Sequence, residues 1–244
     1  MIVRLQSTAS TMKDAAALAA RGEPHGTVVV AETQTEGIGR HGHSWHSEST
    51  GGLYLSMILR LTMTPEALPV VAMALGLAVQ RAIDDVAGIA CDLRWPNDVL
   101  LNEKKLAGIL VQTADSAVIA GIGVNVNQAG FPEELRSIAT SLLLETGEEH
   151  SKEELLGRIV MQSLRYAGLL ADRGKRPILR EFEARSSYVR GKSVDVESGD
   201  RVVTGVTEGL DENGFLLVRT LDGIETIVAG GVRPQAMARK NVRA

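Results

Sequence analysis

Hydrophobic and polar residues alternate along this chain in two different ways, and the change falls near residue 190. Before it, apolar runs of strand length alternate with longer segments that have helical spacing. After it, valines such as Val194 and Val196 follow a two-residue period between turns rich in Gly, Asp and Asn. The pattern predicts a mixed domain over residues 1–189, a small antiparallel β unit over 190–234 and a tail over 235–244.

The first domain begins with an alanine-rich helical run that follows Ser10 and Thr11. Either hydroxyl is a natural N-cap, and from position alone capping is the better interpretation. The alternative is that these hydroxyls and the free amides of the helix start meet a ligand. Further along, residues 52–59 predict a buried strand and residues 65–86 a long, mostly buried helix.

Residues 34–45 show neither helical nor strand spacing and hold three glycines, two histidines, one arginine and one tryptophan. Glycine lets a backbone lie close to a ligand. Arg40 offers a fork of donors for phosphate or carboxylate oxygens, and Trp45 offers a flat face for a base or ring. Taken alone, the same run is also typical of a surface loop.

A hairpin is predicted where two short apolar runs flank the turn at residues 102–104. Asn97 and Asp98 fall at one end of it and Lys105 near the other. An ordinary hairpin with solvated charges is the alternative.

One face of the predicted strand 117–127 carries Gly121, Gly123, Asn125 and Asn127, while the other face is apolar. Glycine weakens a strand unless something must approach it closely. The pattern therefore suggests a flat ligand against the backbone, with a bulge at the sheet edge as the alternative.

Composition narrows the function classes. The formal net charge of -4 argues against a nucleic-acid-binding surface. The single cysteine, Cys91, cannot form an internal disulfide, which fits a reducing cytosol. The start of the chain has no signal-peptide pattern, and the longest apolar stretch, 67–79, is shorter than a membrane span of roughly 20 residues. We therefore expect a cytoplasmic protein.

Together these motifs resemble those of biotin–protein ligases, also called biotin–[acetyl-CoA-carboxylase] ligases. The resemblance extends to about Arg233 and includes Gly191-Lys192-x-Val194 in the C-terminal unit. Its five main motifs, in order, are Ser10-Thr11, Gly37-x-Gly39-Arg40-x-Gly42-x-x-Trp45 after Gln34, Trp95-Pro96-Asn97-Asp98, Lys105-Leu106-Ala107-Gly108 and Gly121-Ile122-Gly123-Val124-Asn125.

The resemblance implies an α+β fold: a mixed β-sheet flanked by helices, as in lipoate ligases and class II aminoacyl-tRNA synthetases, with a small C-terminal β-barrel. It implies that the carboxylate of biotin attacks the α-phosphate of ATP, giving biotinyl-5'-adenylate and pyrophosphate. A lysine of a biotin carboxyl carrier protein then attacks the activated carbonyl and releases AMP.

The resemblance also implies cofactors and partners. Mg²⁺ is expected to arrive with ATP, without a metal site built from side chains. Some family members carry an N-terminal DNA-binding domain, but Met1 lies only a few residues before the first motif, so we expect no nucleic-acid partner. No membrane partner is expected, and a homodimer is one open arrangement.

The family's roles can be assigned to residues of this sequence. Lys105 is the expected main catalytic residue, with Arg40 holding phosphate or adenylate oxygens and Trp45 stacking on adenine. Asp98 is expected to help position the acceptor lysine, and the glycine loop to close over the adenylate and exclude water. The expected biotin-binding residues are Ser10, Thr11, Met12, Gln34, Gly37, Ile38, Gly39, Arg40, Lys105, Gly121 and Gly123. The expected ATP-binding residues are Arg40, His41, His43, Trp45, Asn97, Lys105 and Asn125.

Three alternatives stay open. A lipoate–protein ligase shares the fold and the chemistry, although the glycine–arginine loop and Trp-Pro-Asn-Asp favour biotin. A metal-binding module could use His41, His43 and His46. A non-catalytic biotin-binding protein could have lost its phosphate cradle.

The last alternative arises because Ile38, His41 and His43 stand where many relatives have arginine. A histidine can replace arginine only when protonated, and free histidine titrates near pH ~6.5. We predict that the KM for ATP increases as pH rises through this range, and that His43→Arg weakens the dependence. Identical flat profiles of KM against pH in both proteins would contradict this.

Overall fold

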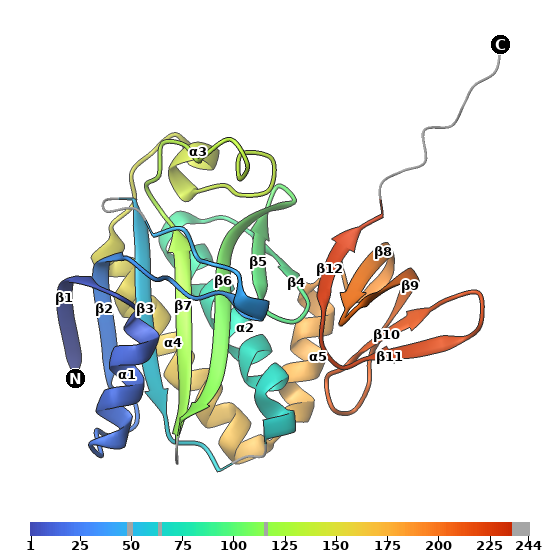
Figure 1. Ribbon diagram of the computed structural model, residues 1–244, viewed down its shortest axis with the longest axis horizontal. Helices are drawn as coiled ribbons and strands as arrows, with labels where there is room; N and C mark the ends of the chain where they lie inside the picture. The colour runs from blue at the N-terminus through green and yellow to red at the C-terminus, as the bar shows by residue number, and fades with distance from the viewer. Residues whose placement is uncertain (48–50, 63–64, 115–116, 236–244) are drawn as a thin grey trace.

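The structure is a computed structural model that describes residues 1–47, 51–62, 65–114 and 117–235, with His41 and Pro65 described by their backbone alone. Within these ranges the chain forms a seven-stranded mixed sheet and a five-stranded antiparallel sheet (Figure 1). The first sheet has the order β1-β2-β3-β7-β6-β5-β4, and only β1 and β2 pair in parallel.

The strands of the first sheet are β1 (Ile2–Thr8), β2 (Val28–Gln34), β3 (Gly52–Leu59), β4 (Asp92–Arg94), β5 (Asp98–Leu101), β6 (Lys104–Ala114) and β7 (Ala117–Asn125). The helices are α1 (Thr11–Ala20), α2 (Leu68–Ala87), α3 (Leu142–Thr146), α4 (Lys152–Arg173) and α5 (Lys175–Arg185), with single 3₁₀ turns η1 (Arg40–Gly42) and η2 (Pro65–Ala67). The strands of the second sheet are β8 (Arg190–Ser198), β9 (Arg201–Leu210), β10 (Leu216–Arg219), β11 (Ile224–Ile227) and β12 (Gly231–Pro234).

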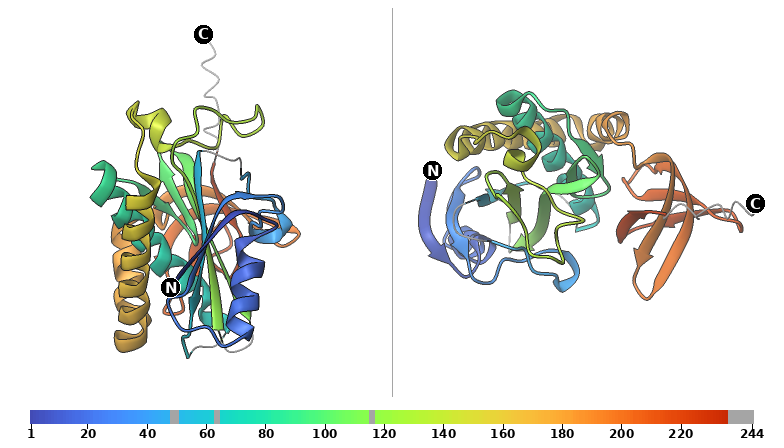
Figure 2. Two further views of the ribbon diagram at one scale, coloured as in Figure 1. Left: turned by 90° about the vertical axis from the view of Figure 1, so that its left-hand side faces the viewer. Right: turned by 90° about the horizontal axis from the view of Figure 1, so that it is seen from above.

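Helices cover both faces of the first sheet, with α2, α4 and α5 on one side and α1 on the other (Figure 2). Because both faces are covered, all eight residues of β3 are buried and its apolar run is nearly continuous. Most of α2 is buried between the sheet and α4, as its predominantly apolar sequence predicts. The predicted strand at 52–59 and the long helix are therefore confirmed.

The second sheet has the order β11-β10-β9-β8-β12, so β11 and β12 are its unpaired edges. It is an open sheet rather than the closed β-barrel that we expected. Strands β10, β11 and β12 have four residues each, which is too short to extend round the sheet and close it.

A short joint fixes the second sheet beside β4. Asp92 accepts hydrogen bonds from the backbone N–H and the hydroxyl of Ser187, and Ser186 Oγ donates to the Leu93 carbonyl at 2.6 Å. Trp95, which is fully buried, donates from Nε1 to the carbonyl of Gly214, in the turn between β9 and β10, at 2.9 Å. The second sheet is therefore held against the edge of the first one, near the Trp-Pro-Asn-Asp motif.

Cys91 is buried and unpaired, and burial raises the pKa of its thiol to about 12, as expected of a structural cysteine. Among the described residues, no helix combines the length and the apolar character needed to cross a bilayer.

Candidate active site

A cavity of about 910 Å³ lies between the α1 side of the first sheet and strands β8 and β12 of the second sheet. All five main motifs reach it, although they are far apart in the sequence. Its lining includes Ser10, Thr11, Met12, Gln34, Ile38, Gly39, Arg40, His43, Trp45, Arg94, Asn97, Asp98, Glu103, Lys105, Gly108, Gly121, Gly123, Glu197 and Arg233.

The β5–β6 hairpin positions Lys105. Asn102 and Glu103 have positive φ values of 49° and 64°, as a tight two-residue hairpin turn requires. The Lys105 backbone is also fixed on its other side, because its N–H donates to the Ile138 carbonyl at 2.7 Å and its carbonyl accepts from the Thr140 N–H at 3.0 Å. The backbone from which the Lys105 side chain extends is therefore held on both sides.

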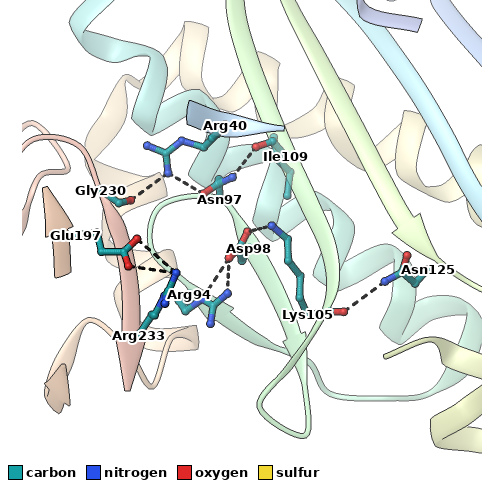
Figure 3. A network of polar contacts seen from close by, with 10 residues as sticks. All are labelled: Arg40, Arg94, Asn97, Asp98, Lys105, Ile109, Asn125, Glu197, Gly230 and Arg233. Carbon is teal, nitrogen blue, oxygen red and sulfur yellow. Dashed lines mark hydrogen bonds and ion pairs between the residues drawn. The ribbon is translucent and has the colours of Figure 1, made fainter. Parts of the chain in front are cut away.

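A single carboxylate, that of Asp98, binds two cations in the cavity (Figure 3). Its Oδ1 lies 2.6 Å from Lys105 Nζ. Its Oδ2 accepts from Arg94 Nη2 at 2.7 Å and from Arg94 Nε at 3.2 Å. Burial alone would raise the pKa of Asp98, but the neighbouring charges of Lys105 and Arg94 hold it below its ordinary value. Asp98 is therefore ionised at neutral pH.

Arg40 connects the glycine loop to the second sheet. Its Nη1 donates to Asn97 Oδ1 at 2.9 Å and to the Gly230 carbonyl at 3.2 Å (Figure 3). Burial lowers the pKa of Arg40, while the charge of Asp98 opposes that shift. Even a lowered value leaves this guanidinium charged, because arginine starts from a pKa above 12.

The glycine face of the sheet is covered by two side chains. A Cβ on Gly121 would lie 2.6 Å from Met12 Sδ, and one on Gly123 would lie 2.4 Å from the Trp45 ring. Trp45 also has Lys105 Nζ at 5.4 Å from its ring centroid. Glycine is needed here because only a bare backbone leaves room for a flat group against the strands.

The start of α1 forms the other end of the site. Ser10 occupies the N-cap position, but its side chain makes no capping hydrogen bond. Instead Gln34 Oε1 accepts from the Thr11 N–H at 2.9 Å and from Thr11 Oγ1 at 3.0 Å. The predicted capping by Ser10 or Thr11 is therefore wrong. The Ser10 hydroxyl is buried without a hydrogen-bond partner and lines the cavity, which favours the ligand interpretation.

Comparison with known proteins gives the family. Residues 4–128 match the biotin/lipoate A/B protein ligase family, and residues 190–232 match the biotin protein ligase C-terminal domain. The chain belongs to the biotin protein ligase family. It is similar to the biotin–[acetyl-CoA-carboxylase] ligase of Mycobacterium tuberculosis, with 36% identity over 231 residues that cover 92% of this chain and 85% of that protein.

Two further biotin protein ligases support the same assignment. The bifunctional ligase/repressor BirA of Bacillus subtilis is 36% identical over 231 residues, covering 91% of this chain and 70% of that protein. The biotin protein ligase of Aquifex aeolicus, solved in complex with biotin and ATP, has a TM-score of 0.86 and 32% identity, covering 96% of this chain and 98% of that one. The predicted α+β fold of mixed sheet and flanking helices is thereby confirmed.

Most of the residues expected to bind substrates line the cavity; Gly37 does not, and neither does Asn125. It is buried, and its amide donates to the carbonyls of Thr140 at 3.0 Å and Lys105 at 3.4 Å. The expectation that Asn125 contacts a phosphate is corrected accordingly: it joins the segments that support Lys105. Gly37 lies at the base of the loop, where its carbonyl accepts from the Trp45 N–H at 2.8 Å.

The loop histidines are only partly placed. His43 is exposed at the cavity wall, whereas the side chain of His41 lies outside the described residues. The alternative of a metal site at His41, His43 and His46 therefore stays untested by the described residues. Elsewhere in the described part of the chain, no three His, Cys, Asp or Glu residues cluster as metal ligands would.

Sequence interpretation did not single out the cavity residues Arg94, Glu103 and Glu197. Arg94 directly precedes the Trp-Pro-Asn-Asp motif on an alternating strand, so its face could have been inferred. The position of Glu197 in the cavity could not have been inferred from the sequence, because it depends on how the second sheet is placed against the first one.

We predict that Asp98→Asn lowers the free energy of unfolding by about 3 kcal/mol at pH 7, because it leaves two partly buried cations without their carboxylate. The pKa of Asp98 is lower in the folded than in the unfolded protein, so its stabilisation is complete above roughly pH 4 and is lost as pH falls through the folded-state pKa. Urea denaturation of wild type and variant should therefore give converging values in acid.

Asp222→Asn, at an exposed turn, is the matched control and should equal wild type at every pH. A wild-type advantage over Asp98→Asn that stays constant down to pH 3 would contradict the assignment.

Proposed function

We propose that this chain activates biotin with ATP as biotinyl-5'-adenylate and transfers the biotinyl group to a lysine of a biotin carboxyl carrier protein. One observation supports this more than any other. Within one cavity, Lys105 lies between a set of hydrogen-bonding groups at α1 and a cationic, phosphate-compatible end at Arg40 and Arg94.

The biotin end is built from Ser10, Thr11 and Gln34. Biotin's ureido group is flat and has donors and acceptors on its edges. The partnerless hydroxyl of Ser10 and the Gln34 side chain offer complementary groups. Met12 and Trp45 lie directly on the backbone of Gly121 and Gly123 and would pack against the rings of biotin.

The first step brings two anions together, because a carboxylate oxygen attacks the α-phosphorus. Lys105 is the cation placed to neutralise the charge shared by the carboxylate and the α-phosphate. Arg40 lies on the glycine segment and, once released from Asn97 and Gly230, would bind phosphate oxygens. Its present partners are neutral, so an anion competes favourably for it.

Mg²⁺ would neutralise the remaining charge of the triphosphate. Each cavity carboxylate that the structure describes forms an ion pair with a basic side chain: Glu103 lies 3.7 Å from Lys192, and Glu197 lies 3.1 Å from Arg233. Asp98 is shared as described above. This donor set does not form a metal site of its own, so Mg²⁺ would enter bound to ATP.

In the second step, the acceptor amine attacks the mixed anhydride and AMP leaves. Both oxygens of Asp98 already bind Lys105 and Arg94. We therefore assign Asp98 to holding Lys105, in place of the expected role of positioning the acceptor lysine. Trp45 covers Lys105 and the glycine face, and in this position it would shield the anhydride from water. It lies over the sheet, so stacking on adenine would require it to move.

We infer a cytoplasmic enzyme whose macromolecular partner is the carrier protein. The absence of nucleic-acid binding stays a prediction from the net charge of -4, and a homodimer stays a prediction from the family resemblance.

Exchange of labelled pyrophosphate into ATP tests the first step. The purified protein should catalyse the exchange with biotin and should not catalyse it with lipoate at the same concentration. When a carrier domain is added, mass spectrometry should detect one biotinylated lysine. Equal exchange with lipoate would favour a lipoate ligase. No exchange with either acid would indicate a non-catalytic biotin-binding protein.

A further inference from the structure

Arg94 is a cavity cation to which no step of the reaction has been assigned so far. It lies on β4, the edge strand nearest the second sheet, while α1 packs at the opposite side of the first sheet. One edge of its guanidinium is fixed on Asp98, and one face lies 5.9 Å from the centroid of Tyr188. Only 20% of its side chain is exposed. Arg94 is thus an oriented guanidinium that lines the cavity.

The position of Arg94 follows from its shared carboxylate. Lys105 binds Oδ1 of Asp98 and Arg94 binds Oδ2, so the two cations lie on either side of one anion. Lys105 packs against Trp45 and Gly108, and Gly108 pairs with Gly123 of the glycine face, so the proposed biotin end is on the Lys105 side. Arg94 lies on the other side of Asp98 from Lys105, towards Glu197 of β8 and Arg233 of β12 (Figure 3).

The other cavity cations are less available for this region. Arg233 is 70% exposed and pairs with Glu197 at 3.1 Å. Arg40 belongs to the glycine loop and bonds Asn97 and Gly230. Arg94 and Lys105 share the single negative charge of Asp98. A net positive charge therefore remains on the Arg94–Asp98–Lys105 cluster.

We propose that Arg94 binds the β- and γ-phosphates of ATP and holds the pyrophosphate leaving group, an inference that rests on the proposed function. When the carboxylate oxygen of biotin bonds to the α-phosphorus, the bond from that phosphorus to the β-bridging oxygen breaks. The electron pair stays on pyrophosphate, whose charge increases as it leaves. A guanidinium binds two such oxygens at once, which a lysine cannot do.

The test compares Arg94→Met and Arg94→Lys with wild type in biotin-dependent pyrophosphate–ATP exchange. We expect the KM for pyrophosphate and the KM for ATP to increase at least tenfold in Arg94→Met and by an intermediate factor in Arg94→Lys, with the KM for biotin unchanged. Transfer from isolated biotinyl-adenylate to the carrier domain, which involves no pyrophosphate, should keep its wild-type rate in both variants.

Arg165→Met is the matched control, because Arg165 lies 5.9 Å from the ring of Tyr166 but does not line the cavity. Its exchange kinetics should equal those of wild type. An unchanged KM for pyrophosphate in both Arg94 variants would overturn the proposal. An equal loss in adenylate transfer would also overturn it, since Arg94 would then act only by supporting Asp98 and Lys105. Wild-type exchange tests the proposed function separately.

Discussion

The ion pairs of Asp98 are the interaction on which the site depends. Two cations close together repel each other, and burial penalises both, so neither Lys105 nor Arg94 would stay in the cavity without an intervening anion. Because Asp98 shares its oxygens between them, the cluster is fixed in geometry yet retains a net positive charge. That remaining charge can attract an anionic substrate without first breaking the cluster.

The residues of this cluster lie close together in the sequence, and the fold connects them to segments that are far away in it. Asp98 and Lys105 come from one hairpin, whereas Arg94 lies on the strand that the joint at Ser186 and Ser187 fastens to the second sheet. Arg40 contacts both the first sheet and Gly230 of the second one. Because one guanidinium touches both units, a substrate that draws Arg40 away would also release the glycine loop from the second sheet.

Much of this site could be predicted from the sequence, since local patterns determine local structure. The hairpin that carries Lys105 was evident from two apolar runs and a turn, and the glycine face from the strand period. The capping of α1 could not be predicted, because Gln34 reaches the helix start only after β2 has folded beside it. Asn125 was misassigned for a similar reason: its partners, Thr140 and the Lys105 backbone, depend on a loop with no regular period.

The central claim is that a fixed ammonium at Lys105 allows the carboxylate and the phosphate to react. The most direct measurement is the single-turnover rate of biotinyl-adenylate formation in Lys105→Met, which keeps an unbranched side chain of nearly the same size and removes its charge. Because both biotin and ATP are saturating, weaker substrate binding cannot explain a lower rate. We expect a loss of at least about a hundredfold, the scale found when one charge-stabilising donor is removed from an active site. A rate within twofold of wild type would contradict the account.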